Sequence, residues 1–341
     1  MFYIYKKRCD VYMIKASNLT KKFRIAQAPT GRFSIIRSLI RPVYTEKYAV
    51  NNICFTINEG DIVGYIGQNG AGKSTTIKML SGILVPTTGS IQVNGINPFE
   101  ERKKHLYQIG TVFGQKTSLW WDVPVIDSFN ILKEMYRVDD YSFQENLNMF
   151  VDILDMSSFL QQPVRQLSLG QRMRADLAAA MIHSPQILFL DEPTIGLDVI
   201  AKQKLRDFIV EINRTKGVTI MLTTHDMVEM EKLATKIIVI DEGHIVFDGS
   251  IQELRNRYGY RRTVCLEFSN KPPEFRMAGT DVQYKDNNVI EVTFDPNLYS
   301  VGDIITEVHK KDVAIKDITI QETDIDHVVS NIYTQKGREN E

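Results

Sequence analysis

The sequence predicts an α/β fold: a mostly parallel sheet with flanking helices, followed by a small α+β domain. Four near-continuous apolar runs are typical of buried parallel strands that helices cover on both faces. These runs are residues 61–67, 187–190, 218–224 and 237–240. Further along, residues 262–268 and 288–294 alternate apolar and polar side chains, which indicates half-buried strands. The change of pattern predicts two domains, and 341 residues are enough for two.

The composition is that of an ordinary globular protein. Lysine and arginine number 41, aspartate and glutamate 42, so the formal net charge is −1, and 43% of the residues are hydrophobic. Nucleic-acid-binding proteins usually have a basic excess, so we expect no nucleic-acid partner. No apolar run approaches the ~18 residues of a membrane-spanning helix, and residues 1–10 lack the apolar core of a signal peptide. Cys9, Cys54 and Cys265 have no metal-ligand spacing, so we expect a soluble protein with free thiols in a reducing cytosol.

The core domain is predicted over residues 13–255, starting with a strand. Residues 1–12 precede it, either as an ordinary extension or because translation begins at Met13. An insertion is predicted at residues 21–47. This segment contains seven basic residues and one acidic residue, Glu46, so its net charge is +6. The apolar residues at 33–40 have near-helical spacing. This fits either an amphipathic helix near an anionic membrane surface or a solvated loop with one short packed helix.

Two further segments complete the predicted organisation. Residues 116–183 lack strand patterns, which predicts a helical subdomain inside the core domain. After a short helix or linker at 251–258, an accessory α+β domain is predicted over 256–335, with a tail at 336–341. Its later elements are predicted as helices at 299–309 and 324–333 and a strand at 313–320.

A phosphate-binding loop follows the first of the apolar runs. The sequence from 67 to 75 fits the pattern G-x-x-x-x-G-K-[ST] between a predicted strand and a predicted helix. It reads Gly67-Gln68-Asn69-Gly70-Ala71-Gly72-Lys73-Ser74-Thr75. In such loops the backbone N–H groups surround the phosphates, and the next helix points its positive end at them. We expect Lys73 to reach the β- and γ-phosphates and Ser74 to bind magnesium.

Polar residues also follow the C-terminal ends of two later predicted strands. Asp191 and Glu192 follow the apolar run 187–190, at the strand end where α/β proteins bind ligands. We expect Asp191 to hold magnesium, and Glu192 to activate the attacking water. His225 follows the run 218–224 and is a candidate contact to the γ-phosphate.

Further motifs distinguish this sequence from a general phosphate-loop protein. They are Gln115, Leu167-Ser168-Leu169-Gly170-Gln171, Ile195-Gly196-Leu197-Asp198 and His225. With the phosphate loop and Glu192, they occur in the order found in the ATPase subunit of ATP-binding cassette (ABC) transporters, which residues 13–249 resemble. Residues 110–124 and 318–329 are similar to the branch of type 2 exporters that contains sodium-exporter-like ATPases. The resemblance also implies that His225 binds the γ-phosphate.

The resemblance implies roles for the other motif residues. Gln115 would contact magnesium or its water and sense the γ-phosphate. Ser168, Gly170 and Gln171 would cap the ATP bound to a second chain, and Asp198 would line the dimer seam. The family usually has a glycine pair in the signature, whereas Leu169 replaces the first glycine here. We expect its side chain to point away from the nucleotide.

An aromatic side chain upstream of the phosphate loop would stack on adenine. The resemblance places Phe23 in the usual position after the first strand. Because a predicted insertion follows it, Tyr44 and Tyr48 are alternatives.

These observations predict an ATPase that binds ATP and Mg²⁺ and works as a dimer, most simply a homodimer. It would bind an integral membrane permease at the cytoplasmic face of the membrane, as a peripheral subunit for export. The alternative is a soluble ABC ATPase that acts on nucleic acid or ribosomes. Trp120 and Trp121 are predicted either to face the permease or to form a buried pair.

Overall fold

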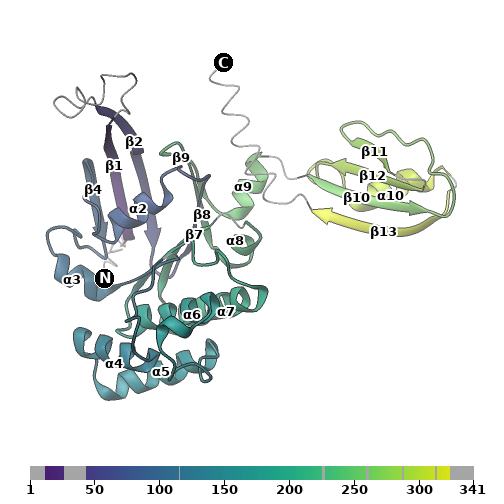
Figure 1. Ribbon diagram of the computed structural model, residues 1–341. Coiled ribbons are helices and arrows are strands. Elements are labelled where there is room, and N and C mark those ends of the chain that lie inside the picture. Colours follow the sequence, from purple (N-terminus) through teal and green to yellow (C-terminus); the bar gives the residue numbers. More distant parts are fainter. Residues whose placement is uncertain are drawn as a thin grey trace, which may run out of the picture. The chain divides into compact units, whose positions relative to one another are not determined.

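The computed structural model describes residues 12–26, 44–114, 116–224, 227–258, 261–285, 288–311 and 313–322. The chain divides into two compact units between Gly249 and Ser250. This division falls slightly before the boundary predicted after residue 255. Each unit is described by itself below (Figure 1).

The first unit is built on a six-stranded sheet. Its order is β5 (Ile109–Phe113), β6 (Ile187–Asp191), β7 (Thr219–Thr224), β3 (Ile62–Ile66), β8 (Lys236–Asp241) and β9 (His244–Gly249). The first five strands are parallel, and β9 pairs antiparallel with β8. Every residue of β3, β6 and β7 is buried, which explains why these strands are continuously apolar. The predicted parallel sheet is confirmed.

An antiparallel sheet packs against this core. It has the order β2 (Tyr44–Asn58), β1 (Tyr12–Ala26) and β4 (Thr88–Val93). One apolar cluster joins Ile14 and Phe55 of this sheet to Tyr65 and Phe189 of the parallel sheet. At the two ends of the predicted insertion at 21–47, the long strands continue their pairing as far as Ala26 and Tyr44. The insertion itself stays a prediction.

Helices account for most of the remaining first unit. Residues 116–183 hold α4 (Val125–Tyr136), α5 (Asp140–Ile153), a 3₁₀ turn η1 (Val164–Gln166) and α6 (Leu169–Met181). The other helices are α2 (Lys73–Leu80), α3 (Arg102–Gln108), α7 (Val199–Lys216) and α8 (Met227–Leu233). The buried rings of Phe150 on α5 and Phe208 on α7 meet edge to face, 5.6 Å between centroids, which joins the helical segment to the core.

The second unit begins with α9 (Ile251–Tyr258) and holds a four-stranded antiparallel sheet. The sheet order is β11 (Asp281–Lys285), β12 (Val289–Phe294), β10 (Arg262–Phe268) and β13 (Ile315–Glu322). One helix, α10 (Val301–His309), packs on it. The α+β character is as predicted, while β11 was missed because its residues are mostly exposed and lack alternation.

Some predictions lie outside the described residues. These are the extension before Tyr12, the helical spacing at 33–40, the helix at 324–333 and the tail at 336–341. The extent of the independently folding domains stays a prediction.

Candidate functional site

The phosphate loop connects β3 to α2. Gly72, which caps α2, has φ 112°, a conformation that favours glycine. A Cβ there would lie 2.3 Å from the carbonyl oxygen of Ala49, so a side chain would also clash with the backbone of β2. The loop therefore needs glycine at this position to present the N-terminus of α2, where N–H groups lack helical partners.

Lys73 is buried at the start of α2 and points back into the loop. Its Nζ donates to the carbonyl oxygens of Gly67 at 2.7 Å and Gln68 at 3.2 Å. It also lies 3.7 Å from Glu192 Oε1. The ammonium group is thus held between the loop and the acidic strand end, where a bound phosphate could replace the carbonyl partners.

Asp191 joins three elements at the end of β6. Its Oδ1 accepts hydrogen bonds from Ser74 Oγ at 3.0 Å and Thr223 Oγ1 at 2.8 Å. Ser74 is on α2 and Thr223 on β7. Sequence reasoning found Ser74 and Asp191 but missed Thr223, whose signal was its position near the end of a strand that runs parallel to β6.

Glu192 has an unusual backbone conformation. Its φ is 52°, in the left-handed region that non-glycine residues rarely adopt. Its N–H donates to Thr223 O at 3.1 Å and Thr223 Oγ1 at 2.9 Å, which holds that conformation. Such strain is found disproportionately at functional sites. It turns the chain so that the Glu192 carboxylate stands beside Lys73.

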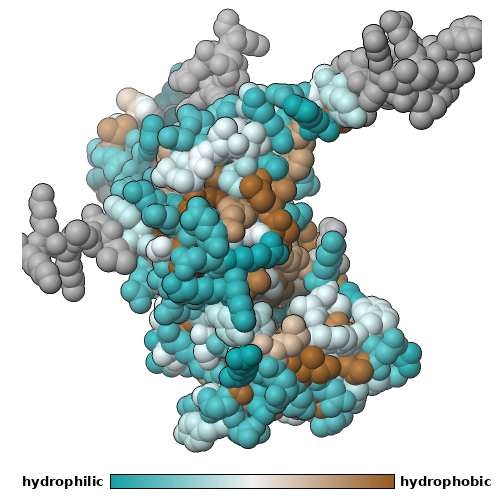
Figure 2. Space-filling model, turned by 90° about the vertical axis from the view of Figure 1, so that its left-hand side faces the viewer, coloured by the Kyte–Doolittle hydropathy of each residue, from teal (hydrophilic) through white to brown (hydrophobic). Residues whose placement is uncertain are grey.

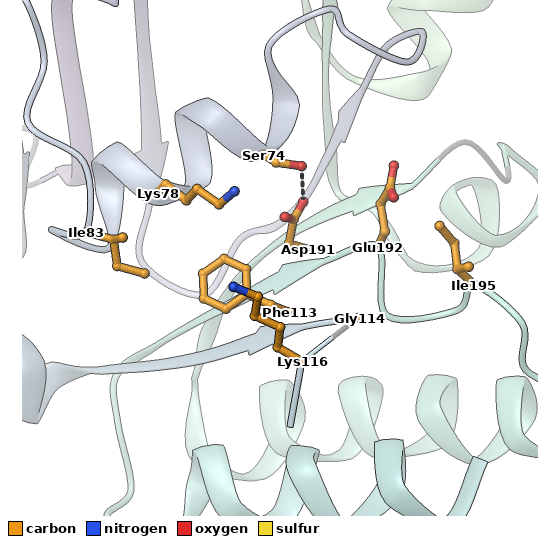
Figure 3. A pocket seen from close by; sticks show the side chains of 9 residues that line it. All are labelled: Ser74, Lys78, Ile83, Phe113, Gly114, Lys116, Asp191, Glu192 and Ile195. Carbon is orange, nitrogen blue, oxygen red and sulfur yellow. Dashed lines mark hydrogen bonds between the residues drawn. The ribbon is translucent and has the colours of Figure 1, made fainter. Parts of the chain in front are cut away.

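Ser74, Asp191 and Glu192 line a pocket of about 320 Å³ (Figure 3). Ser74 and Lys78 come from α2, Phe113 from the end of β5, and Asp191 and Glu192 from the end of β6. The sequence analysis gave no site role to the other lining residues. Ile195, Phe113, Gly114 and Lys116 lie within motif segments that it singled out, whereas Lys78 and Ile83 lie in none. At Gly114 a Cβ would lie 2.4 Å from Glu192 O, so glycine is needed here for the segment after β5 to approach the end of β6.

Two predicted site residues cap helices in this chain. Ser168 Oγ accepts the N–H of Gln171 at 3.2 Å, and Gln171 Oε1 accepts the N–H of Ser168 at 2.9 Å, forming a capping box on α6. Asp198 Oδ1 accepts the N–H of Ala201 at 2.7 Å and caps α7. Neither Ser168 nor Gly170 is among the described residues that line the pocket. Their binding roles therefore depend on a partner and stay proposals.

Leu169 packs on the loop that follows Glu192. A Cβ at Gly196 would lie 2.8 Å from Leu169 Cδ2, and one at Gly170 would lie 3.1 Å from Ala201 Cβ. Gly196 has φ 72°. The leucine that replaces the usual signature glycine thus contacts the segment leading to Asp198.

The aromatic candidates for adenine lie on two different faces of the β1–β2 ladder. Lys22 pairs with Tyr48, and Phe23 with Lys47, so Phe23 and Tyr48 point to opposite faces. Tyr44 pairs with Ala26, which places it on the Tyr48 face. Only one of these faces can meet a given adenine.

Two predicted site residues, Gln115 and His225, lie outside the described residues. Their neighbours are placed: Gly114 N donates to Asp191 O at 2.9 Å, and Thr223 contacts Asp191.

The residues present fit a magnesium ion. Ser74 Oγ and Asp191 Oδ1 are hard oxygen donors 3.0 Å apart at the edge of the pocket. Magnesium is typically held by one or two protein oxygens together with substrate phosphates and waters. Ser74 and Asp191 match that donor set.

A phosphate loop between β3 and α2 lies near two acids at the end of β6, a parallel strand separated from β3 by β7. This arrangement defines a nucleotide-hydrolysing α/β protein of the phosphate-loop class. A family model described as "ABC transporter" matches residues 50–195. The chain is 30% identical over 206 residues to the ABC transporter ATP-binding protein NatA of Bacillus subtilis (strain 168), covering 60% of this chain and 83% of NatA. It is 35% identical over 223 residues to the lantibiotic transport ATP-binding protein SrtF of Streptococcus pyogenes, covering 64% and 93%.

The chain belongs to the ABC transporter ATP-binding family, it binds ATP, and it is an ATPase. The fold agrees with a solved structure, the ATP-binding cassette MJ0796 as a dimer bound to ADP and phosphate after hydrolysis. The TM-score is 0.59 at 23% identity, covering 70% of this chain and 99% of that one. The predicted family and fold are confirmed.

The opposite faces of Phe23 and Tyr48 give a test of adenine stacking. We expect Phe23→Ala to weaken ATP binding by roughly 5- to 150-fold, since stacking of an aromatic side chain on a base contributes about 1–3 kcal/mol. Tyr48→Ala is the matched control on the other face and should keep the Kd for ATP. Titration with a fluorescent ATP analogue measures both. The reverse pattern would assign adenine to the Tyr48 face.

The contact between Leu169 and Gly196 gives a second test. Gly196→Ala and Gly217→Ala both place alanine at positive φ, 72° and 64°, but only the first meets a side chain. We expect both variants to lose ~1 kcal/mol of unfolding free energy. Only Gly196→Ala should also lower ATPase activity, by about tenfold or ~1.4 kcal/mol, because it displaces Leu169.

Adding Leu169→Ala to Gly196→Ala should restore activity, since it removes the clashing atoms. Denaturant unfolding and steady-state phosphate release measure the two effects. Equal ATPase rates in the Gly196 and Gly217 variants would show that this contact has no role in turnover.

Proposed function

We propose that this chain hydrolyses Mg-ATP at the interface of a head-to-tail homodimer and drives a separate membrane permease for export. The observation that carries the proposal is the one-sided site. Ser74, Asp191 and Glu192 line one pocket, and Lys73 lies 3.7 Å from Glu192. The exposed N-terminus of α6 at Ser168 is not among the lining residues. A second chain can supply that missing side.

In the proposed reaction, Glu192 acts as the general base. It orients a water whose oxygen bonds to the γ-phosphorus as the bond to the bridging oxygen of ADP breaks. ADP keeps the electron pair of that bond, and the proton of the water passes to the Glu192 carboxylate. The products are ADP and phosphate.

The remaining site residues, Lys73, Ser74 and Asp191, would bind the phosphates and neutralise their charge. Lys73 would exchange its bonds with the Gly67 and Gln68 carbonyls for bonds to the β- and γ-phosphates. Ser74 and Asp191 would hold Mg²⁺, which supplies positive charge against the charge that develops on the phosphate oxygens. Gln115 is proposed to sense the γ-phosphate through magnesium or its water, and His225 to bind the γ-phosphate.

The signature segment of the partner completes the proposed site. The first turn of α6 presents N–H groups at the positive end of the helix, which suits a phosphate. Ser168, Gly170 and Gln171 would contact the γ-phosphate of the partner's ATP, and Asp198 would line the seam. Such preorganised donors typically contribute ~2.7–4 kcal/mol each to transition-state binding.

An apolar groove supports the permease as partner. A cavity of about 130 Å³ is lined by residues of α3, α4 and α6 and their flanks, among them Leu106, Leu132, Tyr136 and His183. The ring of His183 stacks on Tyr136, and burial lowers the pKa of His183 to about 4, so it is neutral at neutral pH. Figure 2 shows apolar patches both on the lower, helical part of the molecule and on the body above it.

Two exposed tryptophans also support a permease as the partner. Trp120 and Trp121 are 39% and 49% exposed, so the buried pair is excluded. Aromatic side chains at such positions are enriched in interfaces.

No helix among the described residues is long and apolar enough to span a membrane. In this proposal a separate permease, met at the cytoplasmic face of the membrane, completes the transporter. A transport role is supported by the name of SrtF, a lantibiotic transport ATP-binding protein.

Replacing the proposed base should separate ATP binding from turnover. We expect Glu192→Gln to keep ATP binding and to lose about 10²–10⁴ in rate, the usual contribution of a general base. The trapped ATP should make the dimer visible by size-exclusion chromatography. Glu242→Gln is the matched control, since Glu242 also has positive φ but lies in the turn between β8 and β9. Turnover like that of the control would remove Glu192 from this role.

The dimer predicts a disulfide between chains. In a variant without the native cysteines, Ser168→Cys and Asn69→Cys should crosslink two chains in ATP, because Asn69 is exposed on the phosphate loop. Ser157→Cys with Asn69→Cys is the control, since Ser157 is also exposed in the helical segment. Non-reducing gels measure the product. Crosslinks only within one chain would contradict the head-to-tail arrangement.

A further inference from the structure

The buried carboxylate of Asp176 joins the helix α6 to a distant part of the sequence. Asp176 is 4% exposed, and no step of the proposed reaction uses it. Its Oδ1 accepts hydrogen bonds from Thr117 Oγ1 at 2.9 Å, Ser118 N at 2.8 Å and Ser118 Oγ at 3.0 Å. One oxygen of α6 thus holds two residues that precede it by 59 and 58 positions in the chain.

The segment bound by Asp176 carries both tryptophans of the chain. We call residues 117–124 the tryptophan segment, after Trp120 and Trp121. It makes two further contacts with α6 and with the turn η1 before this helix. The Arg172 guanidinium lies 5.6 Å from the centre of the Trp121 ring, and Arg165 N donates to Trp121 O at 3.0 Å. The tryptophan segment is therefore bound to the helix and its preceding turn at several points.

Among these contacts, the one at Asp176 fixes the geometry most firmly. Hydrogen bonds to an ionised group are roughly twice as strong as those between neutral groups. Burial raises the pKa of the Asp176 carboxyl group, and the donors on Ser118 and Thr117 oppose this rise. A buried carboxylate that loses its donors is costly, so the segment cannot move away from Asp176 without a loss of stability. The Trp121 ring, by contrast, is half exposed.

The same helix begins at the residue proposed to contact the partner's ATP. Ser168 caps α6, and Asp176 lies about 12 Å further along the helix axis. Rigid helices and hydrogen-bond networks can carry energetic coupling between two distant sites. Here α6 and the Asp176 carboxylate together connect the cap at Ser168 to the tryptophan segment.

We propose that Asp176 is a positioning residue that holds the tryptophan segment and the signature segment, residues 167–171, together as one body. When Ser168 closes on the partner's ATP, this body moves and carries Trp120 and Trp121 with it. The nucleotide state thereby changes the surface that is offered to the permease. This inference rests on the head-to-tail dimer proposed above.

Tryptophan fluorescence tests the inference, because Trp120 and Trp121 are the only tryptophans in the sequence. The parent protein is the full chain with Glu192→Gln, which is expected to keep ATP in the closed dimer. We expect ATP to shift its emission maximum and to give a dimer by size-exclusion chromatography. Asp176→Ala should abolish the shift and keep the dimer, because it leaves the cap at Ser168 in place.

Three further variants in the same parent separate positioning from folding. Asp176→Asn keeps an oxygen that accepts the donors of Thr117 and Ser118, so most of the shift should return. Thr117→Val with Ser118→Ala removes both hydroxyl donors, leaves Asp176 in place and should reduce the shift. Thr117→Ser with Ser118→Thr is the matched control, since it keeps both hydroxyl groups and should behave as the parent.

The two readouts separate the outcomes. Loss of the shift with an intact dimer in Asp176→Ala, and its return in Asp176→Asn, supports the proposal. An unchanged shift in Asp176→Ala would overturn it, and so would loss of the dimer together with the shift, which indicates a purely structural role. If Asp176→Ala does not fold, the variant without the two hydroxyl groups decides in the same way.

The parent protein distinguishes this inference from the proposed function. A parent that forms the ATP-dependent dimer without any shift in emission contradicts the role of Asp176 alone. A parent that forms no dimer in ATP contradicts the head-to-tail dimer and, with it, the inference.

Discussion

The carboxylate of Asp191 is the interaction on which the nucleotide site depends. It accepts hydroxyl groups from α2 and from β7 while standing at the end of β6, so it ties three elements at one point. A buried carboxylate must be hydrogen-bonded to be stable, and here both partners are hydroxyl groups, one on the helix α2 and one on the neighbouring strand β7. If Asp191 were lost, Ser74 and Thr223 would lose a common acceptor, and the phosphate loop would lose its link to the acidic strand.

The end of β6 also has a strained backbone at Glu192 and a close contact with the backbone at Gly114. Glu192 adopts a positive φ that Thr223 stabilises by accepting its N–H, and Gly114 approaches within a distance that excludes any Cβ. These features cost stability locally and persist because the buried strands around them are rigid. The parallel core therefore positions a site whose local geometry would not form in an isolated peptide.

The sequence predicted those parts that depend on local pattern. The continuous apolar strands, the phosphate loop and the acids after β6 follow from burial on both faces and from ligand positions in α/β sheets. It did not predict that β1 and β2 pair as far as Ala26 and Tyr44, because basic residues on an exposed ladder have no apolar alternation. The sequence also could not decide whether Phe23 or Tyr48 stacks on adenine, because the register between β1 and β2 determines which face of the sheet each side chain is on. Thr223 was missed because a hydroxyl at a strand end has no distinctive pattern until its partner is known.

The polar groups expected to bind ATP have hydrogen-bond partners within this chain. Lys73 donates to loop carbonyls, Ser74 to Asp191, and Ser168 accepts from Gln171. Binding must therefore exchange existing hydrogen bonds for new ones, and each exchange contributes only about 0.5–1.5 kcal/mol net. The negative charge of the phosphates favours this exchange. An ammonium group or a helix N-terminus forms stronger hydrogen bonds with phosphate than with neutral carbonyl groups. The arrangement thus favours a polyphosphate over a neutral ligand of similar size.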